Sequence, residues 1–199
     1  NVGRKSISML MDLLAKRFAI RKYTAQQVSR EDLELIMQAG EYAPSAGGGQ
    51  RSAFVGVRNA ALVRELGRMN MARFDRSHLA GSYVSREQPS TIDDPRITDG
   101  FYGAPCVVCL FGQANFAFKV ADAYCAAENM VLQATELGVS SCIVSRGPET
   151  FANDRGQELM RAWNVPVGYD CVCFVILGYR DGQPPHRKPR KDGRTRIVE

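Results

Sequence analysis

Two apolar segments of strand length constrain most strongly what this chain of 199 residues can fold into. They cover residues 104–112 and 171–179 and are rich in valine, cysteine and phenylalanine. Both are much shorter than the roughly 20 apolar residues that a membrane-spanning helix requires. Short, continuous apolar runs of this kind predict buried strands at the centre of a sheet.

Segments with helical signals lie around these two strands. Ser29 and the acidic pair that follows resemble a capping box, and Pro44 ends the helix that begins there. The longest helix is expected over 115–137, where alanines on more than one face are typical of a buried or interface helix. Further helices are predicted over 8–17, 62–71 and 152–163, and further strands over 53–58 and 141–145. The interleaved elements predict an α+β or α/β fold in a single domain over 1–199.

One long segment, residues 75–99, has no periodic pattern. It is polar and contains Pro89 and Pro95. A loop of this length inside a compact domain is usually a lid, a binding loop or disordered. We expect a variable lid here.

Positive charge is concentrated at the two ends of the chain. Residues 1–30 contain seven basic residues and one acidic residue, and residues 180–199 contain seven and three, whereas 31–179 contain 12 and 17. Because arginine and lysine both bind phosphate, the two ends are candidates for one shared phosphate site. The alternative is a solvated basic surface. Nucleic acid is disfavoured, because the charge forms no continuous stripe and no nucleic-acid motif is present.

The chain contains little acid–base machinery. Neither of its two histidines has an obvious partner, and the glycine-rich nucleotide loops and the nucleophile elbow are absent. Cys106 and Cys109 would point to opposite faces of a strand, so we expect reduced core thiols and no metal centre. Such a chain is either not an enzyme or takes its chemistry from a cofactor. Because Asp12 interrupts the first apolar stretch, no signal peptide is predicted, and a cytoplasmic location without membrane contact is expected.

Several motifs occur in a specific order. Residues 17–23, Arg-Phe-Ala-Ile-Arg-Lys-Tyr, resemble the Arg-(Arg/His)-Ser-x-Arg-x-Phe opening of the FMN-dependent nitroreductase family. Residues 43–50 resemble its Ala-Pro-Ser-x-x-Asn-x-Gln segment, and residues 122–138 resemble its long central helix. Lys-Pro-Arg at 188–190 resembles its closing Lys-x-Arg. The matches follow one another over residues 11–191, nearly the whole chain.

The resemblance implies a central, mostly antiparallel sheet flanked by helices, and a homodimer whose interface contains the long helix and two FMN molecules. The residues that it places around FMN are Arg17, Phe18, Ala19, Arg21, Pro44, Ser45, Ala46, Gly48, Gln50, Asn70, Ile143, Val144, Ser145, Lys188 and Arg190. The arginines and Lys188 would hold the phosphate and ribityl chain, residues 44–46 of the partner would line the ring, and residues 143–145 would pack beside it. For the substrate we expect Phe74, Tyr83, Phe101 and Tyr102, which are available to stack on a ligand.

The activity implied is a ping-pong oxidoreduction, in which NAD(P)H delivers a hydride to flavin N5 and a nitroaromatic, quinone or similar acceptor is then reduced. No protein side chain is expected to be catalytic. Two departures from the motif, Ala19 for serine and Gly48 for asparagine, remove polar groups and should weaken FMN binding. They leave room for a flavin-binding or storage protein without turnover. A flavin-fragmenting or dehalogenating branch of the same family is the other alternative.

Overall fold

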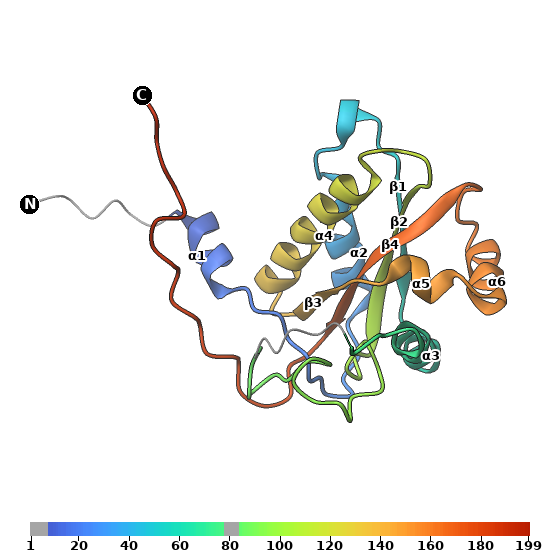
Figure 1. Ribbon diagram of the computed structural model, residues 1–199, viewed down its shortest axis with the longest axis horizontal. Helices are drawn as coiled ribbons and strands as arrows, with labels where there is room; N and C mark the ends of the chain where they lie inside the picture. Colours follow the sequence, from blue (N-terminus) through green and yellow to red (C-terminus); the bar gives the residue numbers. More distant parts are fainter. Residues whose placement is uncertain (1–7, 78–83) are drawn as a thin grey trace, which may run out of the picture.

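The computed structural model describes residues 8–77 and 84–199, and its centre is a four-stranded antiparallel sheet (Figure 1). The strand order is β1 (Ser52–Val57), β2 (Cys106–Gln113), β4 (Tyr169–Gly178) and β3 (Ser140–Val144). The two apolar segments therefore form the two central strands, as predicted. The antiparallel α+β arrangement is also confirmed.

The central strands are apolar throughout because both faces of the sheet are covered. Along β2, Val108 and its alternate neighbours enter one core, while Cys109 and its alternate neighbours enter the other. Cys106 and Cys109 thus point to opposite faces, as the strand argument requires. Burial raises the pKa of the Cys106 thiol to about 12, so this thiol is protonated at neutral pH.

Different helices cover the two faces of the sheet. On one face α2 (Arg30–Glu41) packs along α4 (Lys119–Glu136), and Figure 1 shows both lying across the sheet. On the other face lie α3 (Ala60–Ala72), α5 (Gly147–Phe151) and α6 (Asp154–Ala162). The 18 residues of α4 extend about 27 Å, and its alanines let α2 and the sheet approach closely.

The helix expected over 152–163 is present as α6, and a separate short helix, α5, precedes it. The Asn153 side chain begins α6 by accepting a hydrogen bond from the Gly156 amide at 2.9 Å. An N-cap asparagine starts a new helix because its side chain satisfies an amide that has no helical partner. The helix α5 was missed, because five residues carry no readable periodicity.

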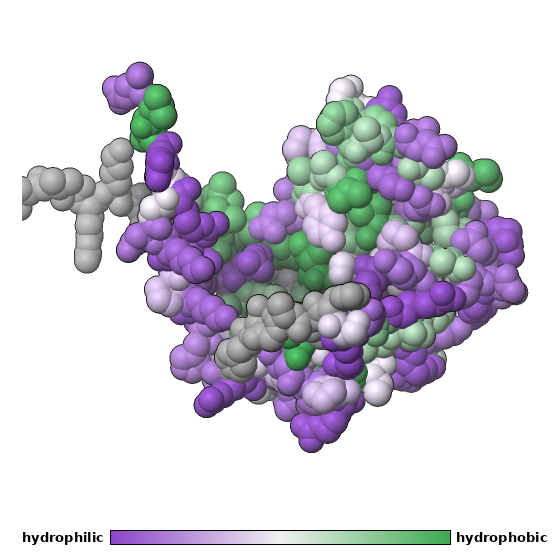
Figure 2. Space-filling model, in the orientation of Figure 1, coloured by the Kyte–Doolittle hydropathy of each residue, from purple (hydrophilic) through white to green (hydrophobic). Residues whose placement is uncertain are grey.

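The first helix, α1 (Met9–Lys16), has no buried residue. Met9 is 90% exposed, and Leu10 and Met11 are more than half exposed. Figure 1 shows α1 and the end of the C-terminal tail at one side of the molecule, away from the sheet. Figure 2 shows a hollow between this side and the body, with apolar side chains in its walls. No helix in the described part of the chain combines the length and apolar character that a membrane span demands.

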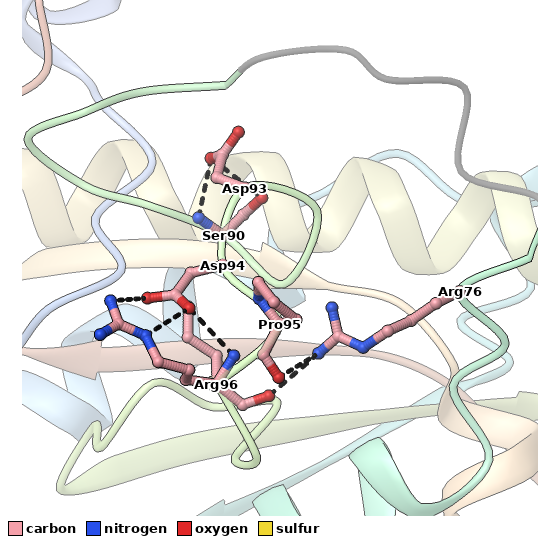
Figure 3. Close-up of polar contacts among 7 residues, drawn as sticks. Arg76, Ser90, Asp93, Asp94, Pro95 and Arg96 are labelled. Carbon is pink, nitrogen blue, oxygen red and sulfur yellow. Dashed lines mark hydrogen bonds and ion pairs between the residues drawn. The ribbon is translucent and has the colours of Figure 1, made fainter.

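The described part of the 75–99 segment contains no helix or strand, but side chains form hydrogen bonds with its backbone. Asp93 accepts hydrogen bonds from the amides of Val84 and Ser90 at 2.8 and 2.9 Å. The Arg76 guanidinium donates to the carbonyls of Thr91, Pro95 and Ile97, two of which are seen in Figure 3. These contacts give residues 84–97 a defined shape, and their function as a lid stays a prediction.

Candidate functional site

The two basic ends of the chain meet in one cleft of about 360 Å³, called here the basic cleft. One wall is the N-terminal arm, residues 17–23, and the other is the tail. A third contribution comes from Val84 and Ser85 of the loop. The residues predicted to surround FMN that line this cleft are Arg17, Phe18, Ala19, Arg21, Lys188 and Arg190. Residues about 170 positions apart in the chain are thus brought to one place by the fold.

The arm is held in place by the edge of the sheet. Ala19 forms a parallel bridge to Ser141, and the Ile20 amide donates to the Ser141 carbonyl at 2.9 Å. The Tyr23 hydroxyl donates back to the Ile20 carbonyl at 2.7 Å. The arm therefore lies alongside β3 at the edge of the sheet. This pairing fixes the direction in which the side chains of Arg17 and Arg21 leave the backbone.

Gln88 connects the arm, the loop and the tail. Its side chain is fully buried, and its Oε1 accepts a hydrogen bond from the Arg21 amide at 2.8 Å. Its Nε2 donates to the carbonyls of Asp181 and Gln183, both at 3.1 Å. A buried amide with all these partners is a structural connector. Sequence reasoning missed Gln88, because one glutamine in a polar loop belongs to no pattern.

The basic cleft brings several cations together. Arg17 approaches Glu128 only at 3.9 Å, and Arg187 lies over the Phe18 ring at 4.8 Å. Within residues 8–77 and 84–199, no carboxylate oxygen lies within 4.0 Å of a side-chain nitrogen of Arg21 or Arg190. A group of cations in one concave place favours an anionic ligand, and phosphate matches guanidinium geometry.

A second cleft of about 180 Å³, the inner cleft, adjoins the basic cleft and shares Arg21 and Val84 with it. The end of β3 forms its floor with Ile143, Val144 and the following Ser145. These are the three residues predicted to lie beside a flavin ring. The rest of the lining comprises Phe74, Ser90, Thr91, Ile92, Tyr102, Cys142 and Arg146. Burial raises the pKa of the Cys142 thiol, although the nearby Arg21 opposes the shift.

Arg146 was not predicted from the sequence, yet it occupies the end of the inner cleft. Its Nε and Nη2 donate to the carbonyl and Oδ1 of Asn70 at 3.2 and 2.6 Å, and its guanidinium lies 4.4 Å from the centre of the Phe74 ring. Burial lowers the pKa of this guanidinium. The only sequence signal for Arg146 was its position directly after the strand that was expected to flank the flavin.

Two other predicted residues, Asn70 and Phe101, lie differently from expectation. Asn70 is fully buried and donates to the Ser145 carbonyl and to Thr150, so its contact with the inner cleft passes through Arg146. The expectation that Phe101 stacks on a substrate is wrong. Its ring is fully buried, 4.9 Å from that of Phe174, and belongs to the core. Phe74 and Tyr102 do line the inner cleft, whereas Tyr83 lies outside the described residues.

The segment expected to reach the ring from a partner chain lies elsewhere in its own chain. Pro44, Ser45 and Gln50 line a separate cleft of about 460 Å³ between α2, α4 and β1, and Ala46 and Gly48 lie in the short turn beside it. The Ala46 amide donates to Asp122 near the start of α4 at 3.0 Å. Figure 1 shows this loop at the opposite end of α4 from α1. A single chain therefore does not bring these residues to the arm.

Known proteins resemble this chain over most of its length. The model of the nitroreductase family matches residues 14–179. A crystal structure of a nitroreductase with bound FMN from Bacteroides fragilis is 27% identical with a TM-score of 0.80, covering 96% of this chain and all of its own. A second nitroreductase with bound FMN, from Desulfitobacterium hafniense, is 26% identical with a TM-score of 0.79 and covers 97% and 100% of the two chains.

A relative from Archaeoglobus fulgidus is 25% identical over 171 residues, which is 85% of this chain and 84% of its own. Its provisional name is NADH dehydrogenase/NAD(P)H nitroreductase. The family match extends from α1 to the end of β4 and so includes the arm, the inner cleft and the whole sheet. On this evidence, together with the fold, the chain belongs to the nitroreductase family.

Proposed function

We propose that this protein is an FMN-dependent NAD(P)H oxidoreductase of nitroreductase type. The observation that carries the proposal is the pair of adjoining clefts, one basic and one bordered by the end of β3, with Arg21 lining both. FMN has the same order of parts, a phosphate at one end and a planar ring at the other. Two structural neighbours hold FMN, and relatives are named as NAD(P)H nitroreductases, which supports the same assignment.

The residues present fit this cofactor. Arg17, Lys188 and Arg190 would hold the phosphate through charge-assisted hydrogen bonds, which are stronger than neutral ones. Arg21 would stand where the phosphate end meets the ring end, and its positive charge would favour extra electron density on the ring. Ile143 and Val144 would exclude water from one face. When bound, FMN supplies the redox chemistry, which is hydride transfer between NAD(P)H and a nitroaromatic, quinone or similar acceptor.

The proposed active unit is a homodimer. Two features support it: Met9, Leu10 and Met11 of α1 are exposed in a single chain, and residues 44–50 lie away from the basic cleft. A second copy would cover Met9, Leu10 and Met11, and would bring its own residues 44–46 toward the ring. Sedimentation equilibrium at micromolar concentration should give twice the chain mass of 22.0 kDa. A strictly monomeric protein that still binds FMN tightly would refute the two-chain site.

The departure at Gly48 is milder than the sequence suggests. Gly48 has φ +62, a left-handed conformation that asparagine tolerates better than most other residues with side chains. The change from asparagine to glycine therefore keeps the backbone shape of the turn and removes only one amide side chain. This favours retained FMN binding over the alternative of a chain that has lost its cofactor.

The decisive experiment is anaerobic mixing of the FMN-loaded protein with NADH or NADPH. We expect the visible absorbance of the bound flavin to disappear after mixing and to return when a quinone is added. A purified protein that does not bind added FMN refutes the proposal entirely. Tight FMN binding without reduction indicates the storage protein instead, and reduction followed by flavin breakdown indicates the fragmenting branch.

A further inference from the structure

Arg146 is a half-buried cation in the wall of the inner cleft. Among residues 8–77 and 84–199, no carboxylate oxygen lies within 4.0 Å of its guanidinium. A partly desolvated charge is costly unless it is paired or bound by a ligand. Its backbone adds to that cost, because φ is +66 and ψ is +31 at a residue that is not glycine.

The Arg146 side chain lines the inner cleft and is held by its neighbours. Two of its three nitrogens bond to Asn70, and its plane is supported by the Phe74 ring. The third nitrogen, Nη1, has no hydrogen-bond partner among the described residues. A guanidinium held in place, with one nitrogen that the described residues do not use, therefore lines the cleft.

A purely structural role explains only part of this arrangement. Arg146 does join the end of α3 to the end of β3 through Asn70. That link uses two of the three guanidinium nitrogens, and it does not require a full positive charge. The described lining of the inner cleft also contains a second cation, Arg21, and no aspartate or glutamate. The cleft is thus positively charged and bordered by the aromatic side chains of Phe74 and Tyr102.

We propose that Arg146, with Phe74 and Tyr102 beside it, selects electron acceptors that are planar and carry a carboxylate or a comparable anionic group. This rests on the proposed function, because the acceptor is the second substrate of the flavin site. The flavin ring would lie against Ile143 and Val144, and the acceptor would bind beside it, with its ring against the aromatic side chains and its anionic group on the guanidinium. Arg146 acts here as a specificity residue, since the redox chemistry does not pass through it.

The test uses redox-inert ligands on the FMN-loaded protein, followed through the visible difference spectrum of the bound flavin. Benzoate and benzamide have nearly the same shape and differ in charge. We expect benzoate to bind roughly tenfold to a hundredfold more tightly than benzamide, the range for a hydrogen bond to a charged group. Arg146→Gln should remove this preference while leaving benzamide binding unchanged. Arg161→Gln, an exposed arginine in the last turn of α6, is the matched control and should retain the preference.

Each result decides the inference. Equal affinity of the wild-type protein for benzoate and benzamide overturns it, as does unchanged benzoate preference in Arg146→Gln. A lowered flavin midpoint potential in that variant without a change in benzoate binding also overturns it, because Arg146 would then act on the flavin ring. If Arg146→Gln does not fold, Arg146→Lys keeps the charge without the planar fork. We expect a several-fold smaller preference in the lysine variant, and an unchanged preference overturns the inference.

Failure of the proposed function gives a different result. A wild-type protein that binds no FMN or is not reduced by NADH or NADPH refutes the oxidoreductase. A protein that passes both tests and shows no preference for benzoate refutes only the role of Arg146.

Discussion

Gln88 offers the sharpest test of how the basic cleft is assembled. Replacing it with methionine keeps nearly the same volume and removes three hydrogen bonds, to the Arg21 amide and to the carbonyls of Asp181 and Gln183. At about 1 kcal/mol net for each bond, the connection between arm, loop and tail loses about 3 kcal/mol. Because methionine fills the space, this estimate contains little cavity cost.

We expect that loss to appear mainly as local opening rather than global unfolding, since the central strands do not depend on Gln88. FMN would then have to order the arm and tail itself, and its Kd should rise roughly tenfold to a hundredfold. Titration of FMN fluorescence measures the Kd, and hydrogen exchange at the Arg21 amide measures the opening directly.

The matched control is Gln157→Met on α6, which removes hydrogen bonds to the Phe151 carbonyl and the Met160 sulfur and lines neither cleft. FMN affinity should be unchanged in the control. The reasoning fails if Gln88→Met binds FMN as tightly as the wild type and the Arg21 amide exchanges no faster.

Three further predictions concern the phosphate, the glycine turn and the core thiols. The double change Arg17→Ala and Arg190→Ala should weaken FMN binding at least about tenfold, through loss of charge-assisted contacts, and equal flavin retention after gel filtration would contradict the phosphate assignment. Gly48→Asn should leave the melting temperature within about 2 °C of the wild type, because φ +62 tolerates asparagine, and a larger fall would show that the turn needs glycine. Burial raises the pKa of Cys106 and Cys173 from 9.0 to about 12, so the unfolded chain ionises first and the free energy of unfolding should fall as pH rises from about 9 toward 12. Urea unfolding at pH 8 and pH 10 measures this decline, and an equally stable protein at both values would contradict it.

The local sequence pattern was enough to predict the elements that lie deepest in the fold. The two central strands were predictable because burial on both faces leaves no polar position in either run. The helix α2 was predictable from its Ser29 cap and its apolar stripe, and the family motifs identified the arm, the glycine turn and the tail.

Errors arose where a side chain's surroundings come from distant parts of the chain. Phe101 sits in a short turn that reads as an exposed aromatic loop, and only the packing of α3 and β4 around it makes it core. Asn70 was rightly singled out, but its contacts come from residues 75 or more positions later. Arg146 belongs to no local pattern, because its partners are Asn70 and Phe74.

The sequence by itself determined the central sheet, the main helices, the family and the two basic ends, because each is encoded in short stretches of residue type and spacing. The tertiary structure alone decided that the two ends form one cleft, that Gln88 holds them together, and that Arg146 joins Arg21 in the wall of the inner cleft. These features depend on contacts between segments about 70 to 170 residues apart in the chain. Contacts of that kind follow from how the elements pack, and no local periodicity carries them.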